Sequence, residues 1–436
     1  MSAIAVPAFA LTWWLAGYLI GRDPRRASLR WPAAALVSYA LGVAAWTVAP
    51  GSSAAEILLC LPALCWAGAV VALLPLTPVE RRPIDRGALA LGALFLLMVV
   101  FLPQVGRLVV LAPLVGALVL LWRMRRQVAP PTLPVALTVM AVLYTAGLAL
   151  LLFPSGGAVP AIAAIGVDLL AVGYLMAVAH AAESGERLRP DVRRSLAGGV
   201  LSLVLLGVPA AVTIALAGHD VVTVVQFVVV ATGATVAGLG NHVRRSMDRV
   251  ALAEDAGLRA DRAALFLNAD ALLRRREPRR LGSIGEPEFL RLTRRALTDF
   301  GDLNRLARSP LTDLPVVGLR LVGREDQPRA RAGALRAVLR ECVSDLRPAG
   351  PFGTTDEWRN YNVLQFCCVL GLNPYSRRLR LDGLNREARL AVDWFRRYVP
   401  EDVTKQWLRE AAMVVAERLW TELEGRQLPT RSIKAP

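Results

Sequence analysis

Long apolar runs fill the first 240 residues of this chain and restrict its fold more than any other feature. Nine runs approach the roughly 20 residues that a helix needs to cross a bilayer. They cover residues 4–20, 32–49, 55–76, 87–103, 107–122, 132–153, 159–181, 196–217 and 221–240. Leucine, valine and alanine follow one another continuously, without the alternation of a barrel strand. A soluble core does not hide this much apolar sequence, so we predict an all-α, polytopic transmembrane bundle of about nine spans.

Arginine is unevenly distributed over the loops between these runs. It clusters after every second run, at residues 22–30, 81–86, 123–126, 187–194 and 244–249. The intervening loops, such as 51–54 and 218–220, contain almost none. Because cytoplasmic loops carry the excess of positive charge, this pattern places the N-terminus outside and the C-terminus in the cytoplasm. We therefore expect a multi-pass protein of the cytoplasmic membrane, with the lipid bilayer as its first partner and the first run retained.

The composition changes after residue 240, where most of the charged residues are found and the net charge of +16 largely arises. We predict a transmembrane domain at 1–240, a juxtamembrane helix and basic linker at 241–285, a cytoplasmic all-helical domain at 286–425, and a tail at 426–436. The stretch 241–273 has no proline and is expected to form one helix, a candidate signalling stalk. Its apolar positions do not sustain heptads, so a homodimer through it stays an open alternative.

Helical periodicity continues through the C-terminal domain. Phe289, Leu292, Ala296 and Phe300 share one helical face. A capping-box pattern at 354–357 predicts the start of a helix that stops near Gly371. Further helices are expected at 385–398 and 401–423. Since no run of alternating strand-like residues appears, the domain is predicted to be a compact helical fold.

Few ionisable residues interrupt the apolar runs. Asp168 lies near the middle of the seventh run, and Tyr144, Tyr174 and Gln226 are candidate partners. An acid at this depth is costly, and it marks either a functional site or a carboxyl that is protonated or bonded to a neighbouring helix. The functional interpretation is a group that senses a ligand or a proton. Both interpretations stay open.

Prolines and small residues within the runs predict special packing. Pro62, Pro113 and Pro209 mark either kinks or the wall of a cavity. Gly233 and Gly238, with alanines nearby, allow the ninth run to approach another helix closely.

Sequence motifs of the common enzymes do not occur. The chain has no phosphate-binding loop, no paired Cys-x-x-Cys, no His-Glu-x-x-His and no nucleophile elbow. His180, His219 and His242 all lie beside apolar runs, so the C-terminal domain has no phosphoacceptor histidine. The five cysteines show no metal-binding spacing. We predict that the protein is not an enzyme and uses no cofactor or metal.

A first resemblance covers about residues 160–217. This region contains IGVDLL at 165–170, GY at 173–174, ESGE at 183–186 and PDVRRSL at 190–196. The order of these motifs resembles the closing part of multi-span membrane sensor modules that precede bacterial histidine kinases. The resemblance implies a sensory role for the membrane domain.

A second resemblance covers about residues 286–423. Its motifs are EFL at 288–290, LNRL at 303–306, SPL at 309–311 and EWRNYNVL at 357–364. They resemble an uncharacterised, helix-turn-helix-like helical output domain of bacterial regulators. The resemblance implies a regulatory output, with DNA binding as one form of it.

A basic stretch rich in aromatic residues is the candidate polyanion-binding site. Its arginines are Arg377, Arg378, Arg380, Arg396 and Arg397, interleaved with Tyr375, Trp394 and Tyr398. Such a patch neutralises the phosphates of nucleic acid or binds anionic lipid heads. A plain solvated surface is the third interpretation.

These observations together predict a multi-pass membrane sensor or regulatory protein, active in signal transduction, whose cytoplasmic helical domain carries the output. A small-solute transporter with a regulatory C-terminal domain is the first alternative. A non-catalytic assembly protein, whose helical domain recruits a cytoplasmic protein partner, is the second.

Overall fold

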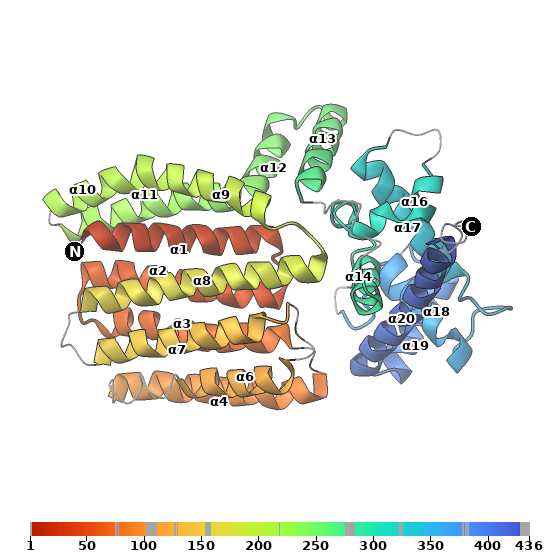
Figure 1. The fold of residues 1–436 in the computed structure, drawn as a ribbon, viewed down its shortest axis with the longest axis horizontal. Helices are drawn as coiled ribbons and strands as arrows, with labels where there is room; N and C mark the ends of the chain where they lie inside the picture. The colour runs from red at the N-terminus through yellow and green to blue at the C-terminus, as the bar shows by residue number, and fades with distance from the viewer. Residues whose placement is uncertain are drawn as a thin grey trace, which may run out of the picture. The chain divides into compact units, whose positions relative to one another are not determined.

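The computed structural model is built of helices, and no strand occurs among the residues that it describes (Figure 1). Those residues are 2–74, 76, 78–101, 111–125, 128, 130–152, 158–217, 219–274, 284–321, 326–376, 379 and 383–427. The chain divides into two compact units. Unit 1 comprises Met1–Ala182 and Leu188–Glu254, and unit 2 comprises Glu183–Arg187 and Asp255–Pro436.

Within the described residues, each of the predicted apolar runs coincides with helical structure, whereas residues 102–110 and 153–157 lie outside the description. The helices are α1 Ser2–Arg22, α2 Ala27–Val48, α3 Ser53–Leu73, α4 Pro78–Phe101, α6 Leu111–Arg123, α7 Leu133–Leu152, α8 Ala158–Ser184, α9 Arg189–Ser202, α10 Val208–Ala217 and α11 Asp220–Gly238. A π-helical turn, η3 Leu203–Gly207, joins α9 to α10 without a break.

Six helical segments among the described residues are long and apolar enough to cross a membrane. They are α2, α3, α7, α8, α11 and the continuous rod of α9 and α10, while α6 is apolar but shorter. The chain is therefore a helical membrane protein. The larger count of about nine spans stays a prediction.

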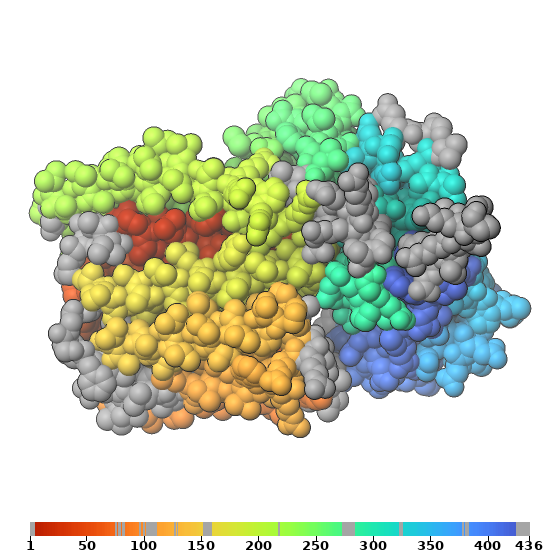
Figure 2. Space-filling view, in the orientation of Figure 1, coloured from red at the N-terminus to blue at the C-terminus, as the bar shows by residue number. Residues whose placement is uncertain are grey.

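The helices of unit 1 from α1 to α11 lie nearly parallel to one another (Figure 1). Helix α2 packs against both α1 and α3, α6 lies against α3, and α1 also contacts α9, α10 and α11. Helices α7 and α8 lie side by side in Figures 1 and 2, and a Cβ on Gly147 of α7 would be 3.0 Å from Ile165 Cγ1 of α8. The core of this unit is formed where these helices meet.

The predicted close packing of α11 is confirmed. A Cβ on Gly238 would lie 2.8 Å from the carbonyl oxygen of Trp14, so the backbones of α11 and α1 touch there. On α8, a Cβ on Gly173 would be 2.8 Å from Leu15 Cδ2. Small residues thus let helices of unit 1 approach each other closely, as membrane helices do.

The stretch expected as one juxtamembrane helix forms two helices, α12 Gly240–Ala251 and α13 Ala256–Arg274. Asp255 Oδ1 accepts a hydrogen bond from the Leu258 backbone nitrogen at 2.8 Å, which caps the start of α13. A local bond between side chain and backbone makes this break, and neither proline nor glycine signals it. The chain passes from unit 1 to unit 2 at the same place. The predicted linker at 275–283 lies outside the described residues.

Unit 2 is helical, as expected for the C-terminal domain. Its longer helices are α13, α14 Glu286–Thr298, α17 Pro328–Ser344, α19 Arg386–Tyr398 and α20 Glu401–Gln427. The shorter elements are α15 Leu303–Leu306, η5 Pro310–Asp313, α16 Pro315–Leu319, η6 Asp356–Trp358, α18 Arg359–Asn362 and the π-helical η7 Val363–Val369. The predicted apolar face of α14 is buried in the core, which also contains Phe366 and Phe395.

The helical region around 356–370 differs in detail from the expectation. Thr355 occupies the N-cap but makes no side-chain capping hydrogen bond, so the predicted capping box is not formed. The helix nevertheless ends where expected, because Gly371 adopts a positive φ of 64° that favours glycine.

Candidate functional site

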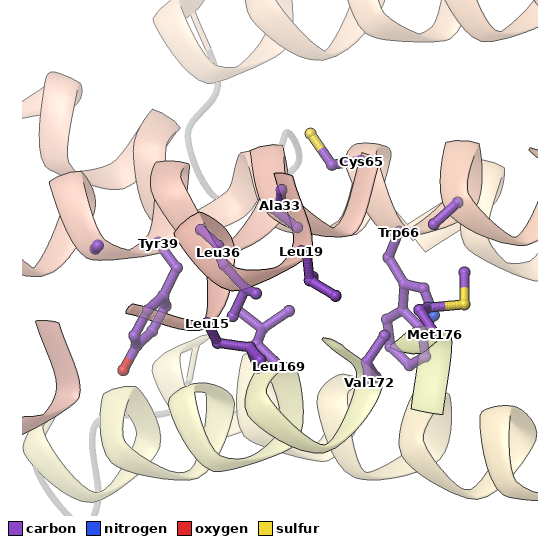
Figure 3. Close-up of a cluster of buried hydrophobic side chains, with 14 of the residues drawn as sticks. Leu15, Leu19, Ala33, Leu36, Tyr39, Cys65, Trp66, Leu169, Val172 and Met176 are labelled. Atoms are coloured by element: carbon purple, nitrogen blue, oxygen red, sulfur yellow. The ribbon is translucent and has the colours of Figure 1, made fainter. Parts of the chain in front are cut away.

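Helix α8 holds Asp168 on its buried side. Leu169, Val172 and Met176 of the same helix are buried, and Asp168 itself is only 5% exposed. Figure 3 shows Val172 and Met176 close to Trp66 of α3, within the core of unit 1. The apolar periodicity of α8 therefore carries the acid into the bundle with the core side chains.

Tyr144 of α7 is the predicted partner that the structure brings near Asp168. Tyr144 is fully buried, and Asp168 lies within electrostatic range of its hydroxyl. Trp66 of α3 packs edge-on against the Tyr144 ring, with the ring centroids 5.6 Å apart. We name Asp168, Tyr144 and Trp66 the Asp168 cluster. Three different helices thus contribute one residue each.

The other two predicted partners lie elsewhere. Tyr174 is 42% exposed, although it is on the same helix as Asp168. Gln226 is half-buried on α11, which packs mainly on α1, α9 and α10. Trp66, in contrast, was not singled out from the sequence. A tryptophan in the middle of an apolar run, away from the interface where this residue is usual, was the available signal.

The Asp168 cluster has unsatisfied polar atoms. Within the described residues, neither carboxyl oxygen of Asp168 nor Trp66 Nε1 makes a hydrogen bond. Leaving one such buried group unpaired costs about 1–3 kcal/mol. Native proteins normally satisfy these groups with protein atoms or bound water. The cluster can therefore offer the Asp168 carboxyl and the Trp66 indole N–H to a small polar guest, or the carboxyl to a proton.

A buried ion pair forms a second polar centre of unit 1. Arg22 Nη1 of α1 donates to Asp191 Oδ2 of α9 at 3.0 Å, and the Tyr18 hydroxyl donates to the same oxygen at 2.7 Å. The side chains of Arg22 and Asp191 are 1% and 9% exposed. Removing one partner of such a pair leaves an uncompensated buried charge, so the pair holds α1 and α9 together.

This ion pair explains part of the 190–196 motif. Ser195, one turn after Asp191, accepts a hydrogen bond from Trp14 Nε1 at 3.1 Å. Both motif residues therefore attach α9 to α1. From the sequence, we interpreted Arg22 only as one of the positively charged residues of the loop at 22–30. The signal that would have revealed its partner was a single acid, Asp191, among the arginines of the 187–194 loop.

The ESGE motif at 183–186 lies in unit 2. Gly185 has a φ of +70°, and a Cβ on it would lie 2.7 Å from Pro310 Cγ and 2.9 Å from Leu292 Cδ2. Glu186 Oε1 is 3.9 Å from Arg308 Nη1. The positive φ and the close neighbours both require glycine at position 185. The Glu183–Arg187 segment is thus packed and ion-paired within unit 2.

The candidate polyanion site is described in part. Arg377, Arg378 and Arg380 lie outside the described residues. Arg396 and Arg397 are exposed on α19. Arg396 Nε donates to the Pro374 carbonyl at 2.6 Å, and its Nη2 donates to the Ser376 carbonyl at 3.2 Å. Arg396 therefore braces a turn, whereas no such contact holds Arg397 among the described residues.

The aromatic residues of this stretch are mostly structural. Trp394 stacks on Trp407 of α20, with ring centroids 5.9 Å apart. The Tyr375 hydroxyl donates to the Val399 carbonyl at 2.9 Å. Tyr398 is 73% exposed. Of the three aromatic residues, Tyr398 alone presents most of its surface to the outside.

Comparisons with protein-family models, with curated proteins and with solved structures each found no match to this chain. Within the described ranges, no group of three or more His, Cys, Asp and Glu side chains is placed to hold a metal ion. A functional proposal therefore rests on the geometry of the Asp168 cluster and of the Glu183–Arg187 segment.

Proposed function

We propose that this chain is a multi-pass membrane sensor or regulatory protein in which α8 connects a receptor site in the bundle to the helical unit 2. One observation carries the proposal. Helix α8 bears Asp168 in unit 1 and runs, without a break, into the Glu183–Arg187 segment of unit 2. A helix rises about 1.5 Å per residue and is stiff between Asp168 and its end at Ser184. A displacement of the helix at Asp168 therefore also displaces its end.

The Asp168 cluster is the receptor site in this proposal. A small polar ligand that pairs with Asp168 and Trp66, or a proton that neutralises Asp168, removes the cost of their unpaired atoms. Such a guest stabilises whichever conformation of the bundle binds it better, and it shifts the population toward that conformation. Within unit 2, the Glu183–Arg187 segment at the end of α8 then passes the shift to Pro310 and Leu292, which pack around Gly185.

The location of the two units follows from the arginine pattern. The positive loops favour a cytoplasmic side for unit 2, in the cell membrane of a bacterium. There, the partner of unit 2 is a cytoplasmic protein, a nucleic acid or the anionic face of the membrane.

The Asp168→Asn variant tests the proposal, because asparagine keeps the shape and removes the acid. We expect altered amide hydrogen exchange in the Glu183–Arg187 segment and α14 of the full chain in lipid nanodiscs. Asp220→Asn is the matched control, since Asp220 is an exposed acid at the start of α11. If amide exchange changes around Asp168 but not in unit 2, the proposed connection from Asp168 through α8 to unit 2 is contradicted.

A flux measurement separates the sensor from the transporter. The purified chain is placed in liposomes that contain a pH-sensitive dye, and a pH gradient is applied. If the chain is a sensor, liposomes with the unmodified protein and liposomes with the Asp168→Asn variant should show the same proton flux as empty liposomes. Flux that Asp168→Asn abolishes would instead support a proton-coupled transporter with a regulatory domain.

A further inference from the structure

Helix α12 starts where a membrane-spanning segment ends. The preceding helix, α11, is long and apolar enough to cross a membrane and ends at Gly238, and α12 begins at Gly240. Both helices belong to unit 1, and α12 runs across the direction that α1 to α11 share (Figure 1). A helix that begins at the end of a span and runs across it lies along the membrane surface.

The corner between α11 and α12 is held against α1. A Cβ on Gly21 of α1 would be 3.3 Å from Leu239 Cδ2. The Leu239 backbone nitrogen donates to the Thr235 carbonyl at 2.8 Å, and the Leu239 carbonyl accepts from the Val243 backbone nitrogen at 3.0 Å. The last hydrogen bonds of α11 and the first of α12 thus meet at one residue, so unit 1 sets the direction in which α12 leaves the bundle.

The apolar residues of α12 form one face. Val243, Met247 and Val250 are four and three residues apart, which places them on the same side of the helix. Met247 is 65% exposed and Val250 is 81% exposed, and the part of the chain that the structure describes buries no residue of α12. At the end of α11, the surroundings of this face are lipid headgroups and the upper acyl carbons.

The charge of α12 is positive. Its sequence has three arginines, Arg244, Arg245 and Arg249, against the single acid Asp248. At about 100° per residue, Arg244 and Arg249 lie on the two flanks of the apolar face and Arg245 lies on the opposite side. Arg245 and Arg249 are exposed. A basic polar face combined with an exposed apolar face is typical of helices that lie in the surface of an anionic membrane.

We infer that α12 binds the surface of an anionic phospholipid bilayer. Met247 and Val250 enter the region of the upper acyl carbons, and Arg245 and Arg249 reach the headgroup phosphates with their long side chains. Unit 1 therefore ends on the membrane surface, before the chain enters unit 2 at Asp255. This inference does not depend on the Asp168 cluster or on the proposed sensor function.

The test places a fluorescent probe on each face of α12 in the full chain. Met247→Cys, Val250→Cys and Asn241→Cys are labelled one at a time with nitrobenzoxadiazole, and Asn241 is the control position because it lies opposite the apolar face. The five native cysteines are buried or half-buried, and labelling of the unmodified chain measures their background. The proteins are placed in nanodiscs of equal parts phosphatidylcholine and phosphatidylglycerol.

Two quenchers then report where each probe lies. We expect a nitroxide on the upper acyl carbons to quench the probes at positions 247 and 250, and aqueous iodide to quench the probe at position 241. If iodide quenches all three probes equally, the apolar face lies in water and the inference fails. If neither quencher reaches positions 247 and 250, protein covers the face, and the inference also fails.

The charge is tested with the probe at position 247. Arg245→Gln and Arg249→Gln should each lower the ratio of lipid-bound to water-exposed probe by about fivefold, the change that about 1 kcal/mol per basic residue produces. Arg249→Lys should keep the ratio, because the charge is retained. Arg329→Gln, at an exposed arginine of α17, is the matched control and should have no effect.

Lipid composition and salt give the final measurement. Nanodiscs of phosphatidylcholine alone should lower the same ratio, as should KCl raised from about 0.1 M to about 1 M, which shortens the screening length from about 10 Å to about 3 Å. If the ratio depends neither on phosphatidylglycerol nor on the two arginines, α12 does not recognise anionic lipid and the inference is overturned.

Discussion

The two units of this protein differ in how closely their helix backbones approach each other at glycines. In unit 1, α1 and α11 cross at glycines, and a Cβ on Gly17 would be 3.5 Å from the Cα of Gly238. In unit 2, large side chains fill the core, and Phe289, Phe300 and Phe395 are fully buried. Fully buried aromatic rings occur in both interiors, Trp66 and Tyr144 among them in unit 1, whereas close approach of helix backbones at glycines is a feature of unit 1.

Close contact between helix backbones suits a domain that spans a membrane. Lipid tails are as apolar as leucine, so membrane helices gain little by burying large apolar groups and associate through close packing and hydrogen bonds. In water, burial of apolar area is the dominant favourable term. Adding a methyl group should therefore damage unit 1 most, whereas removing a ring should damage unit 2 most.

The largest expected effect is in unit 2. Phe395→Ala removes a fully buried ring, and we expect the free energy of unfolding of unit 2 to fall by about 3–5 kcal/mol. Burial raises the pKa of the Cys367 and Cys368 thiols to about 12, so few thiolates are present at pH 8 while unit 2 is folded. Because the thiolate is the reactive form, the urea dependence of alkylation at these thiols measures the unfolding of unit 2.

The control for this prediction is Leu390→Ala on the same helix, where the side chain is 47% exposed. It should leave the alkylation midpoint nearly unchanged. If both variants shift the midpoint equally, the core of unit 2 does not depend on its aromatic side chains.

The second effect is in unit 1. Gly238→Ala places a Cβ 2.8 Å from the Trp14 carbonyl oxygen, so α11 must move away from α1. Overpacking of this kind costs about 1–3 kcal/mol. The thermal stability of the protein in nanodiscs measures it. Gly240→Ala, where a Cβ would meet no atom within 4 Å, should be neutral. Equal stability of the two variants would mean that the glycine crossing does not hold unit 1 together.

The smallest expected effect concerns the candidate polyanion site, where it separates a structural arginine from one that could contact phosphate. Arg396→Ala removes two hydrogen bonds to the turn at 374–376 and should lower the stability of unit 2 by about 1 kcal/mol. Arg397→Ala should leave stability unchanged, and urea unfolding of the two variants measures the difference. If the stretch binds DNA, Arg397→Ala should reduce the slope of log affinity against log salt by about one unit. If Arg397→Ala leaves the slope of log affinity against log salt unchanged, Arg397 makes no phosphate contact.

Much of the fold could be predicted from local sequence. The apolar runs predicted the positions of helices in unit 1, and the periodic apolar residues of α14 predicted its buried face. The break between α12 and α13 could not be predicted in this way, because the Asp255 cap requires knowing which backbone amide is left free. Asp168 and Tyr144 were both singled out as polar residues in apolar runs, whereas the contribution of Trp66 was not.

The sequence by itself determined that this is an all-helical protein with membrane-spanning segments, because apolar run length and helical periodicity are local properties. Only the tertiary structure decided which polar residues meet. Asp168, Tyr144 and Trp66 come from three different helices, and the two partners of the Arg22 and Asp191 ion pair lie far apart in the chain. The choice of partners depends on helix rotation and neighbour order, which small residues such as Gly238 set through contacts across the bundle.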